Sequence, residues 1–202
     1  MISMMITARD VSYRNTDYYV NGEKIATAFS RECRDLNRIR IYENGQPRYR
    51  LDESSRVEWI MRRYLLHISL IFQLLKNPTY DVYDGERKVG SSWEKWFKAL
   101  RTFHINGDMY RTFTHKNETF SLHKNGEQVA LYIKTPEKFF STTSVPRSYS
   151  VLYESTEPLW IIYLFCVFED LCWFADSDNG GTKKILVFRD PYESYTLWTP
   201  CG

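Results

Sequence analysis

The most constraining feature of the sequence is a turn signal that recurs between short runs of aromatic and aliphatic residues. It occurs in four segments: YYVNGEKIA (18–26), IRIYENGQPRYR (39–50), YDVYDGERKV (80–89) and FSLHKNGEQVALYIK (120–134). Asn-Gly and Asp-Gly readily adopt the positive φ angles of tight hairpin turns. We therefore predict four β-hairpins. A fifth, with a weaker signal, is predicted around the Asn-Gly of FHINGDMYRTF (103–113).

The residues around these turns favour strands over helices. In the segment 120–134, Phe120 and Leu122, and then Val129, Leu131 and Ile133, alternate with mostly polar neighbours. A period of two is typical of a strand with one buried face. Aromatic residues make up 16% of the chain, and they favour the pleated surface of a sheet. The sequence therefore predicts a mainly β (α+β) fold built from antiparallel hairpin repeats.

Two longer segments repeat one another between the hairpins. SSRVEWIMRRYLLHI (54–68) and SSWEKWFKALRTFHI (91–105) have Ser, Ser, Trp, His and Ile at the same offsets. Both contain apolar residues at helical spacing and a Ser-x-x-Glu capping box. We predict short amphipathic connector helices near 55–66 and 92–100, each leading into a strand. Alternatively, the first copy continues as one helix towards Leu75, so the segment 54–76 is either one long helix or a helix plus a strand.

The segment LWIIYLFCVFEDLCWF (159–174) is apolar on every side until it reaches Glu169 and Asp170. As a helix it would measure about 24 Å, which is short for a membrane span. A helix that is apolar all round is otherwise buried in its own protein. Two central strands are the alternative. Beyond this segment, we expect a strand at 183–190 and a tail over about the last 12 residues.

Repeated hairpins followed by one apolar helix resemble the tubby C-terminal-like superfamily, which includes the plant LURP-one-related proteins and phospholipid scramblases. The resemblance runs from about Thr79 to Phe174, through TYDVYDGERKVG, FHINGDMYRTF, FSLHKNGEQVALYIK, SYSVLYE and the apolar segment. It implies a closed barrel of about twelve strands around a central hydrophobic helix. It also implies phospholipid headgroup binding or association with membranes. The chain departs from this plan in the segment 54–76 and in residues 175–202, which follow the helix.

Composition places further limits on function. The formal net charge is +2, so we expect no nucleic-acid partner. The four cysteines have no C-x-x-C spacing, which is typical of reduced thiols. The N-terminal apolar run is too short for a signal peptide. We therefore predict one domain over residues 1–202, located in the cytoplasm or peripherally at a membrane.

Candidate catalytic and metal-binding residues are few. His67 and His104 occupy equivalent repeat positions, but no third ligand has suitable spacing, so we interpret both as strand residues. Glu169 and Asp170 would act as an acid or base only if burial raised the pKa. Otherwise they face a polar seam or mark where the helix reaches solvent. No catalytic motif occurs, so we predict a non-enzymatic protein without a cofactor or metal.

The strongest polar candidate is a basic cluster with interleaved aromatic residues in the two repeats. It comprises Arg62, Arg63, Lys95, Lys98 and Arg101. Such residues bind phosphates at a membrane surface, although a solvated helix face is the more ordinary interpretation. We predict a binding module for an anionic ligand, namely phospholipid headgroups at a membrane surface. The alternative is a protein-interaction or assembly domain with neither lipid binding nor catalysis.

Overall fold

The computed structural model describes the chain over seven ranges: 1–12, 15–30, 36–53, 80–94, 101–115, 119–135 and 147–177. Twelve strands and helix α3 (Leu159–Ser177) are formed by these residues. The strands are β1 (Ile2–Ser12), β2 (Asn15–Val20), β3 (Glu23–Ser30), β4 (Leu36–Glu43), β5 (Gln46–Glu53), β6 (Tyr80–Asp84), β7 (Arg87–Glu94), β8 (Arg101–Ile105), β9 (Asp108–His115), β10 (Thr119–Lys124), β11 (Glu127–Lys134) and β12 (Arg147–Tyr153).

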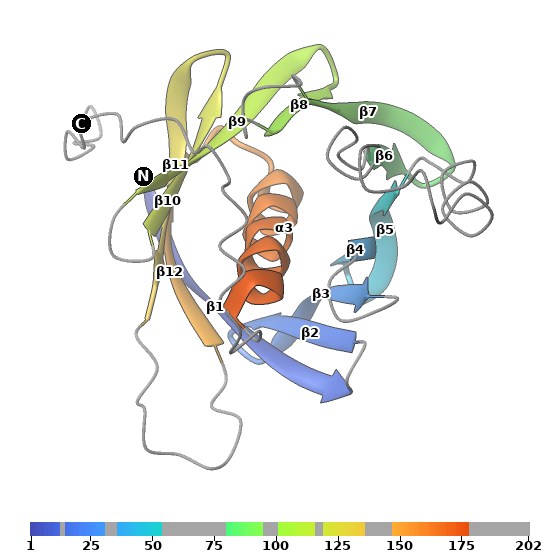
Figure 1. Cartoon of the computed structure of the whole chain (residues 1–202), viewed down its shortest axis with the longest axis vertical. Coiled ribbons are helices and arrows are strands. Elements are labelled where there is room, and N and C mark those ends of the chain that lie inside the picture. The colour runs from blue at the N-terminus through green and yellow to red at the C-terminus, as the bar shows by residue number, and fades with distance from the viewer. Residues whose placement is uncertain are drawn as a thin grey trace, which may run out of the picture.

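The strands form a closed antiparallel barrel in sequence order, with β1 paired to both β2 and β12 (Figure 1). The closing ladder runs from Ile2 opposite Tyr153 to Ala8 opposite Arg147. Closure satisfies the backbone groups that an open sheet leaves unpaired at its two edges. The predicted mainly β fold and closed antiparallel barrel are therefore confirmed.

All five predicted hairpins are present, each with a two-residue loop. In four of them Asn and Gly both have positive φ, beginning at Asn21, Asn44, Asn106 and Asn125. The Asp-Gly hairpin is built differently: Asp84 is the last strand residue, and Gly85 takes the first loop position with φ of 56°. Glycine at this position is typical of a type II′ turn, whereas the Asn-Gly loops resemble type I′.

The barrel has two unlike ends. The five tight loops lie at one end, which we call the turn end. Consecutive strands are antiparallel neighbours in the barrel. All the remaining connections therefore join strand ends at the opposite end, which we call the connection end. Glu53 opposite Tyr80 and Glu94 opposite Arg101 belong to this second end. It therefore carries the connections with the most variable length.

The predicted helix near 92–100 is wrong over its described residues. Ser91 to Glu94 continue β7, and Arg101 begins β8. In this conformation β7 pairs with both β6 and β8, so the barrel stays closed. A helix beginning at Ser91 would leave the backbone groups of the neighbouring strands unpaired. The Ser-x-x-Glu spacing was therefore misleading here, since strand pairing outweighs a local capping signal.

Helix α3 occupies the apolar segment, as predicted, and the two-strand alternative is wrong. Nearly all its side chains from Ile161 to Asp170 are buried. The Phe165 ring packs edge-on against Phe103 of β8, and Phe168 packs edge-on against Tyr80 of β6. The Tyr132 hydroxyl of β11 donates to the Ile162 carbonyl at 3.1 Å. Strands distant in sequence thus share one core with the helix.

Several predictions fall on residues outside the described ranges. These are the connector helix near 55–66, its extension through 76, the strand at 183–190 and the C-terminal tail.

Cys166 is a buried free thiol. Within the described ranges, no helix has the length and hydropathy needed to cross a membrane.

Candidate functional site

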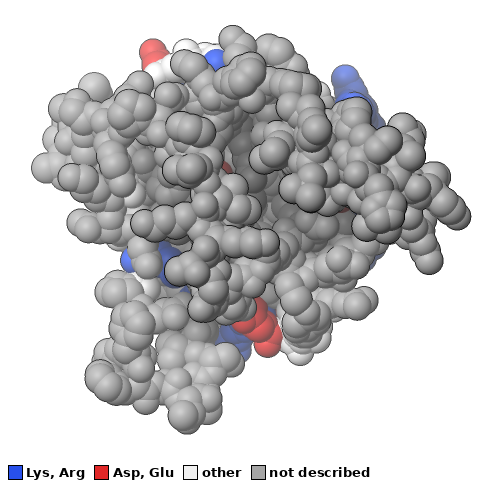
Figure 2. Space-filling view, in the orientation of Figure 1, with Lys and Arg blue, Asp and Glu red and all other residues white. Residues whose placement is uncertain are grey.

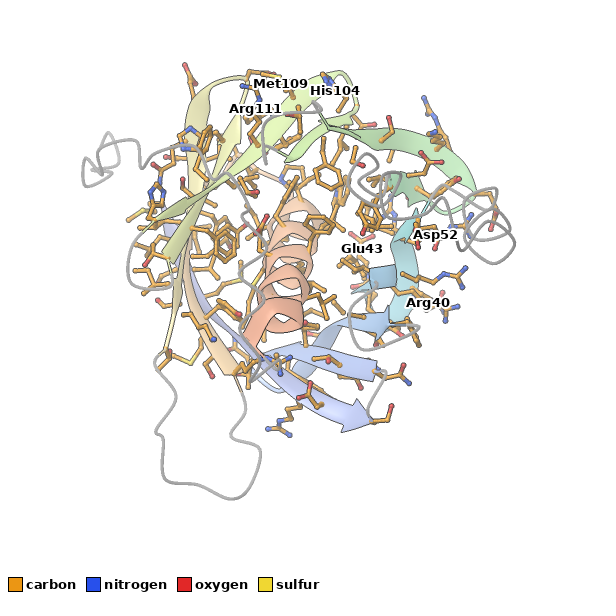
Figure 3. All side chains as sticks on the ribbon, in the orientation of Figure 1. Arg40, Glu43, Asp52, His104, Met109 and Arg111 are labelled. Carbon is orange, nitrogen blue, oxygen red and sulfur yellow. The ribbon has the colours of Figure 1, made fainter. Side chains whose placement is uncertain are left out.

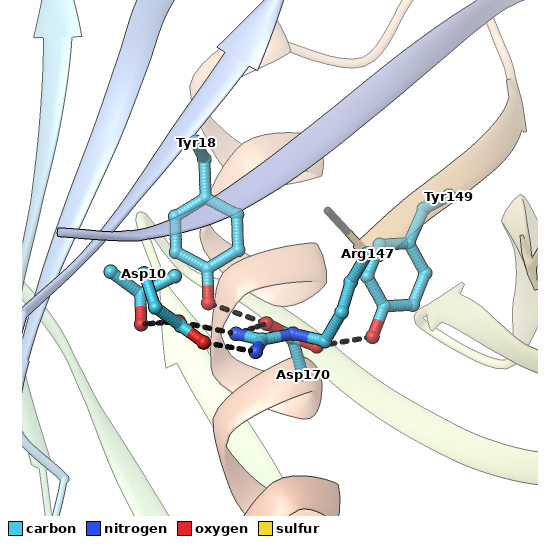
Figure 4. A network of polar contacts seen from close by, with 6 residues as sticks. Asp10, Tyr18, Arg147, Tyr149 and Asp170 are labelled. Carbon is cyan, nitrogen blue, oxygen red and sulfur yellow. Dashed lines mark hydrogen bonds and ion pairs between the residues drawn. The ribbon is translucent and has the colours of Figure 1, made fainter. Parts of the chain in front are cut away.

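The connection end contains a buried polar cluster centred on Asp170, which we call the Asp170 cluster. It joins Asp170 of α3 to Tyr18 of β2, Tyr149 and Arg147 of β12, and Asp10 of β1 (Figure 4). The strands that meet here are those that close the barrel. The cluster therefore links the closing seam to the helix.

Asp170 accepts hydrogen bonds from three side chains. The Tyr18 hydroxyl donates to Oδ2 at 2.7 Å, the Tyr149 hydroxyl donates to Oδ1, and Arg147 Nη2 donates to Oδ2 at 3.2 Å. The Asp170 side chain has no exposed surface. An unpaired buried carboxylate would be very costly, so these three donors account for its presence in the protein interior.

Arg147 connects the buried carboxylate to the surface. Its Nη1 donates to Asp10 Oδ2 at 2.9 Å and its Nη2 to Asp10 Oδ1 at 3.2 Å. The Asp10 side chain is 44% exposed, whereas that of Arg147 is 11% exposed. The Thr16 hydroxyl also donates to Asp10, at 2.8 Å. One guanidinium is thus shared between an interior and an exterior carboxylate.

The ionisation of the cluster follows from burial and charge. Burial raises the pKa of Tyr18 and Tyr149, and the nearby charge of Asp170 raises both further. For Arg147, burial acts to lower the pKa, but Asp170, Tyr18 and Asp10 raise it above its ordinary value overall. The tyrosines therefore remain neutral donors, and the arginine remains a cation. The geometry suits a fixed structural network more than proton transfer.

A second buried carboxylate of α3, Glu169, accepts a hydrogen bond from the Thr112 hydroxyl of β9 at 2.6 Å. Glu169 is 6% exposed and Asp170 is 1% exposed. The idea that these acids mark where the helix reaches solvent is therefore wrong, whereas a polar seam facing the strands describes both. Sequence reasoning identified the two acids but missed their partners, which lie on strands β2, β9 and β12.

The turn end has its own carboxylate, Glu157, just before α3. Tyr110 donates to Glu157 Oε2 at 3.1 Å and Lys124 donates to Oε1 at 3.1 Å. Lys124 also pairs with Asp108 at 3.2 Å, and Asn125 donates to Asp108 at 2.8 Å. We call this group the Glu157 cluster. It holds the start of the helix to the β8–β9 and β10–β11 hairpins.

The predicted basic cluster is only partly within the described residues. Arg62, Arg63, Lys95 and Lys98 lie outside them. Arg101 is the first residue of β8, and it pairs in register with Glu94 at the connection end. The structure thus places one of the five residues by its backbone. It does not describe the side chains of the set.

The described cations on the outer surface of β4–β7 are largely engaged in ion pairs. Arg38 pairs with Asp52 at 2.6 Å, and Arg50 contacts the same carboxylate at 3.2 Å. Lys88 pairs with Asp81 at 2.7 Å. Figure 3 shows Arg40 and Asp52 on the outer side of these strands. In the face shown in Figure 2, acidic and basic side chains appear beside one another at the lower edge.

Histidines gather at one further place that the sequence analysis did not identify. Ser121 Oγ lies 2.7 Å from His115 Nε2 and 3.1 Å from His123 Nε2. Ser121 itself has no exposed surface. The alternation of Ser121 and His123 on one strand was the available signal.

The described part of the chain holds no group of three or more His, Cys, Asp or Glu side chains able to bind a metal ion.

Comparison with known proteins gives no further assignment: no family model, curated protein or solved structure matches the chain.

Proposed function

We propose that the protein is a non-enzymatic binding module of the tubby-like kind, in which α3 is the central helix of the barrel and the connection end binds an anionic ligand. The proposed ligand is a phospholipid headgroup at a membrane surface. Contacts from α3 to β2, β5, β8, β9, β11 and β12 support a central helix. The resemblance found in the hairpin segments supports the lipid ligand.

The observation that carries the proposal is the position of the strand ends that flank the basic residues in the sequence. Arg62 and Arg63 belong to the connection between β5 and β6, whereas Lys95 and Lys98 belong to that between β7 and β8. The strand ends that flank both connections lie at the connection end, and Arg101 begins a strand there. Connections at one end of a rigid barrel are a common location for binding residues. We therefore propose that these five cations act together at the connection end.

The outer surface of β4–β7 supports this choice by contrast. On the outer surface of β4–β7, Arg38, Arg50 and Lys88 already have carboxylate partners. A cation that is paired within the protein contributes little to binding an external anion, because the pair must first be broken. We therefore propose the connection end, and not the outer surface of β4–β7, as the location that binds a phosphate-bearing ligand.

The proposal is tested by sedimentation of the full chain with lipid vesicles. We expect binding to phosphatidylcholine vesicles containing phosphatidylserine, no binding to pure phosphatidylcholine, and weaker binding at high salt. One cation near an anionic surface contributes about 1 kcal/mol, so Arg62→Ala with Arg63→Ala should weaken binding about 30-fold. The triple change of Lys95, Lys98 and Arg101 to Ala should weaken it more.

A matched control removes two cations from the outer surface of β4–β7, Arg38→Ala with Lys88→Ala. This variant changes the net charge as much as the first double variant, and we expect it to bind almost as the wild type does. Equal losses in the two double variants would mean that net charge, and not the connection end, determines binding. Absence of binding to the anionic vesicles would overturn the lipid proposal.

A further inference from the structure

Arg111 of β9 is a cation without a counterion among the residues that the structure describes. Its side chain is half-buried, and its Nε is buried and has no hydrogen-bond acceptor. No described carboxylate forms an ion pair with it. By contrast, Arg50 pairs with Asp52 at 3.2 Å, and Arg147 pairs with Asp170 at 3.2 Å. An anion from solvent can therefore bind Arg111 without first breaking an ion pair.

Strand alternation places Arg111 on the outer side of the barrel. Tyr110 belongs to the core, and Thr112 donates a hydrogen bond to α3. Arg111 lies between them in the strand and therefore points outward. Figure 3 shows Arg111, Met109 and His104 near one another on this side. The register of β8, β9 and β10 gives the outward neighbours of Arg111, which together with it form what we call the Arg111 patch: Thr102, His104, Met109, Phe113, Ser121 and His123.

The Arg111 patch contains no acidic residue. The charged side chains described at nearby positions of β9 and β10 are Asp108 and Lys124, which pair with each other at 3.2 Å. Lys124 also pairs with the buried carboxylate of Glu157 at 3.1 Å. These two charges are therefore already compensated, and Arg111 provides the permanent charge of the patch.

One side of the patch is an ordered aromatic wall. Ser121 Oγ lies 2.7 Å from His115 Nε2 and 3.1 Å from His123 Nε2. Because a hydroxyl has a single hydrogen, at least one of the two imidazoles donates to Ser121. The His123 ring also meets the Phe113 ring edge-on, with the centroids 4.7 Å apart. Since His123 lies directly opposite Arg111, these contacts hold two rings beside the guanidinium.

The composition of the patch selects among anions. One guanidinium carries one positive charge, and its planar set of N–H donors matches a carboxylate in a bidentate arrangement. A phosphate dianion would need more than one cation for charge balance. Met109 and Phe113 lie on either side of Arg111 along the strand, and they offer apolar surface that an inorganic ion cannot use. We propose that the Arg111 patch binds the carboxylate of a small organic acid, with the apolar body of the acid against Met109 or Phe113.

The test is an NMR titration of the full chain with benzoate and with hexanoate. We expect saturable binding with a dissociation constant on the order of 1 mM, which is typical of so small a ligand. The signals that shift should include the side-chain Nε–H of Arg111. Benzamide, which has nearly the same shape as benzoate but no charge, should bind at least about tenfold more weakly.

Variants assign the binding to the patch. Arg111→Gln removes the charge and should weaken benzoate binding about tenfold or more. Met109→Glu supplies a carboxylate within the patch, which should compete for Arg111 and weaken binding by a similar factor. Arg87→Gln removes one exposed cation from β7 and is the matched control, so it should bind benzoate as the wild type does. Thermal unfolding confirms that each variant is folded before it is titrated.

Several results would overturn the proposal. These are absence of saturable binding of both acids, equal binding of benzamide and benzoate, and equal losses in Arg111→Gln and Arg87→Gln. Tighter binding of inorganic phosphate than of benzoate would also overturn it and would assign the patch to phosphate. Arg62→Ala with Arg63→Ala should leave benzoate binding unchanged, and Arg111→Gln should leave vesicle binding unchanged. The patch and the connection end can therefore fail or succeed separately.

Discussion

The two ends of the barrel hold α3 by carboxylates in different surroundings. At the connection end, the Asp170 side chain is fully buried and its cationic partner Arg147 is 11% exposed. At the turn end, the Glu157 side chain is 4% exposed, but its partner Lys124 is 28% exposed. Water can therefore replace a lost partner more easily at the turn end. The comparison shows that the turn end, with its tight two-residue loops, has the more accessible anchor.

The largest effect is expected for Asp170→Ala. The change leaves the buried Arg147 without its interior carboxylate, and the hydroxyls of Tyr18 and Tyr149 without their acceptor. Removal of one partner of a buried ion pair costs about 3–5 kcal/mol. Denaturant unfolding measures the loss, with Asp170→Asn as a control that retains the size and one acceptor oxygen. A loss below about 1 kcal/mol would show that the cluster does not anchor the helix.

Glu157→Ala should destabilise the protein less. Lys124 keeps its ion pair with Asp108 and gains water, whereas Tyr110 loses an acceptor. We expect a loss of about 1–3 kcal/mol, which is typical of a hydrogen bond to a charged group. The same unfolding measurement compares it with Asp170→Ala. If Glu157→Ala proved the more damaging change, the comparison between the two ends would be reversed.

Alkaline pH should weaken the turn end through Tyr110. Burial and the charge of Glu157 raise the pKa of Tyr110 from 10.0 to about 12. Between pH 10 and about pH 12, Tyr110 therefore loses its proton in the unfolded chain but retains it in the folded protein. Stability from this group is therefore complete below pH 10 and is lost as the pH rises towards 12.

Tyr110→Phe provides the control for this pH effect. Unfolding free energies measured across the alkaline range should fall less steeply in the variant than in the wild type. Burial also raises the pKa of Tyr18 and Tyr149, so those groups contribute a slope that both proteins share. Identical slopes in the two proteins would remove Tyr110 from the explanation.

The smallest effect is expected for Asp10→Asn at the outer side of the Asp170 cluster. Asp10 is 44% exposed, so solvent screens its interaction with Arg147. We expect a loss of less than about 1 kcal/mol, measured by the same unfolding experiment. A loss as large as that of Asp170→Ala would mean that the exposed carboxylate, and not the buried one, holds the arginine in place.

The features that could be predicted from the sequence are those set by local chemistry. Asn-Gly and Asp-Gly predicted the positions of all five hairpins, because a two-residue hairpin turn requires residues that readily adopt positive φ. The uninterrupted apolar run located α3. The helix predicted to begin near Ser91 was wrong. The capping-box spacing of Ser91 and Glu94 is a local signal, whereas these residues form a strand because they pair with β6 and β8.

The candidate site was less predictable, because its contacts join distant parts of the chain. Asp170 was identified as an unusual acid, but its partner Tyr18 is 152 positions away. The pairing of β1 with β12 also had no local signal. Met5 of β1 and Ile133 of β11 become neighbours of Ser150 of β12 only after this closure. Alternation within a single strand does not reveal such neighbours.

The pairing of the first strand with the last has a consequence for biosynthesis. During translation, β1 emerges from the ribosome early but its partner β12 is completed only at Tyr153, and the core residues of α3 follow later still. The nascent chain therefore presents an unpaired edge and apolar inward surfaces for most of its synthesis. Such surfaces promote aggregation of incomplete chains. We expect this protein to depend on nascent-chain chaperones more than a protein whose sheets close locally.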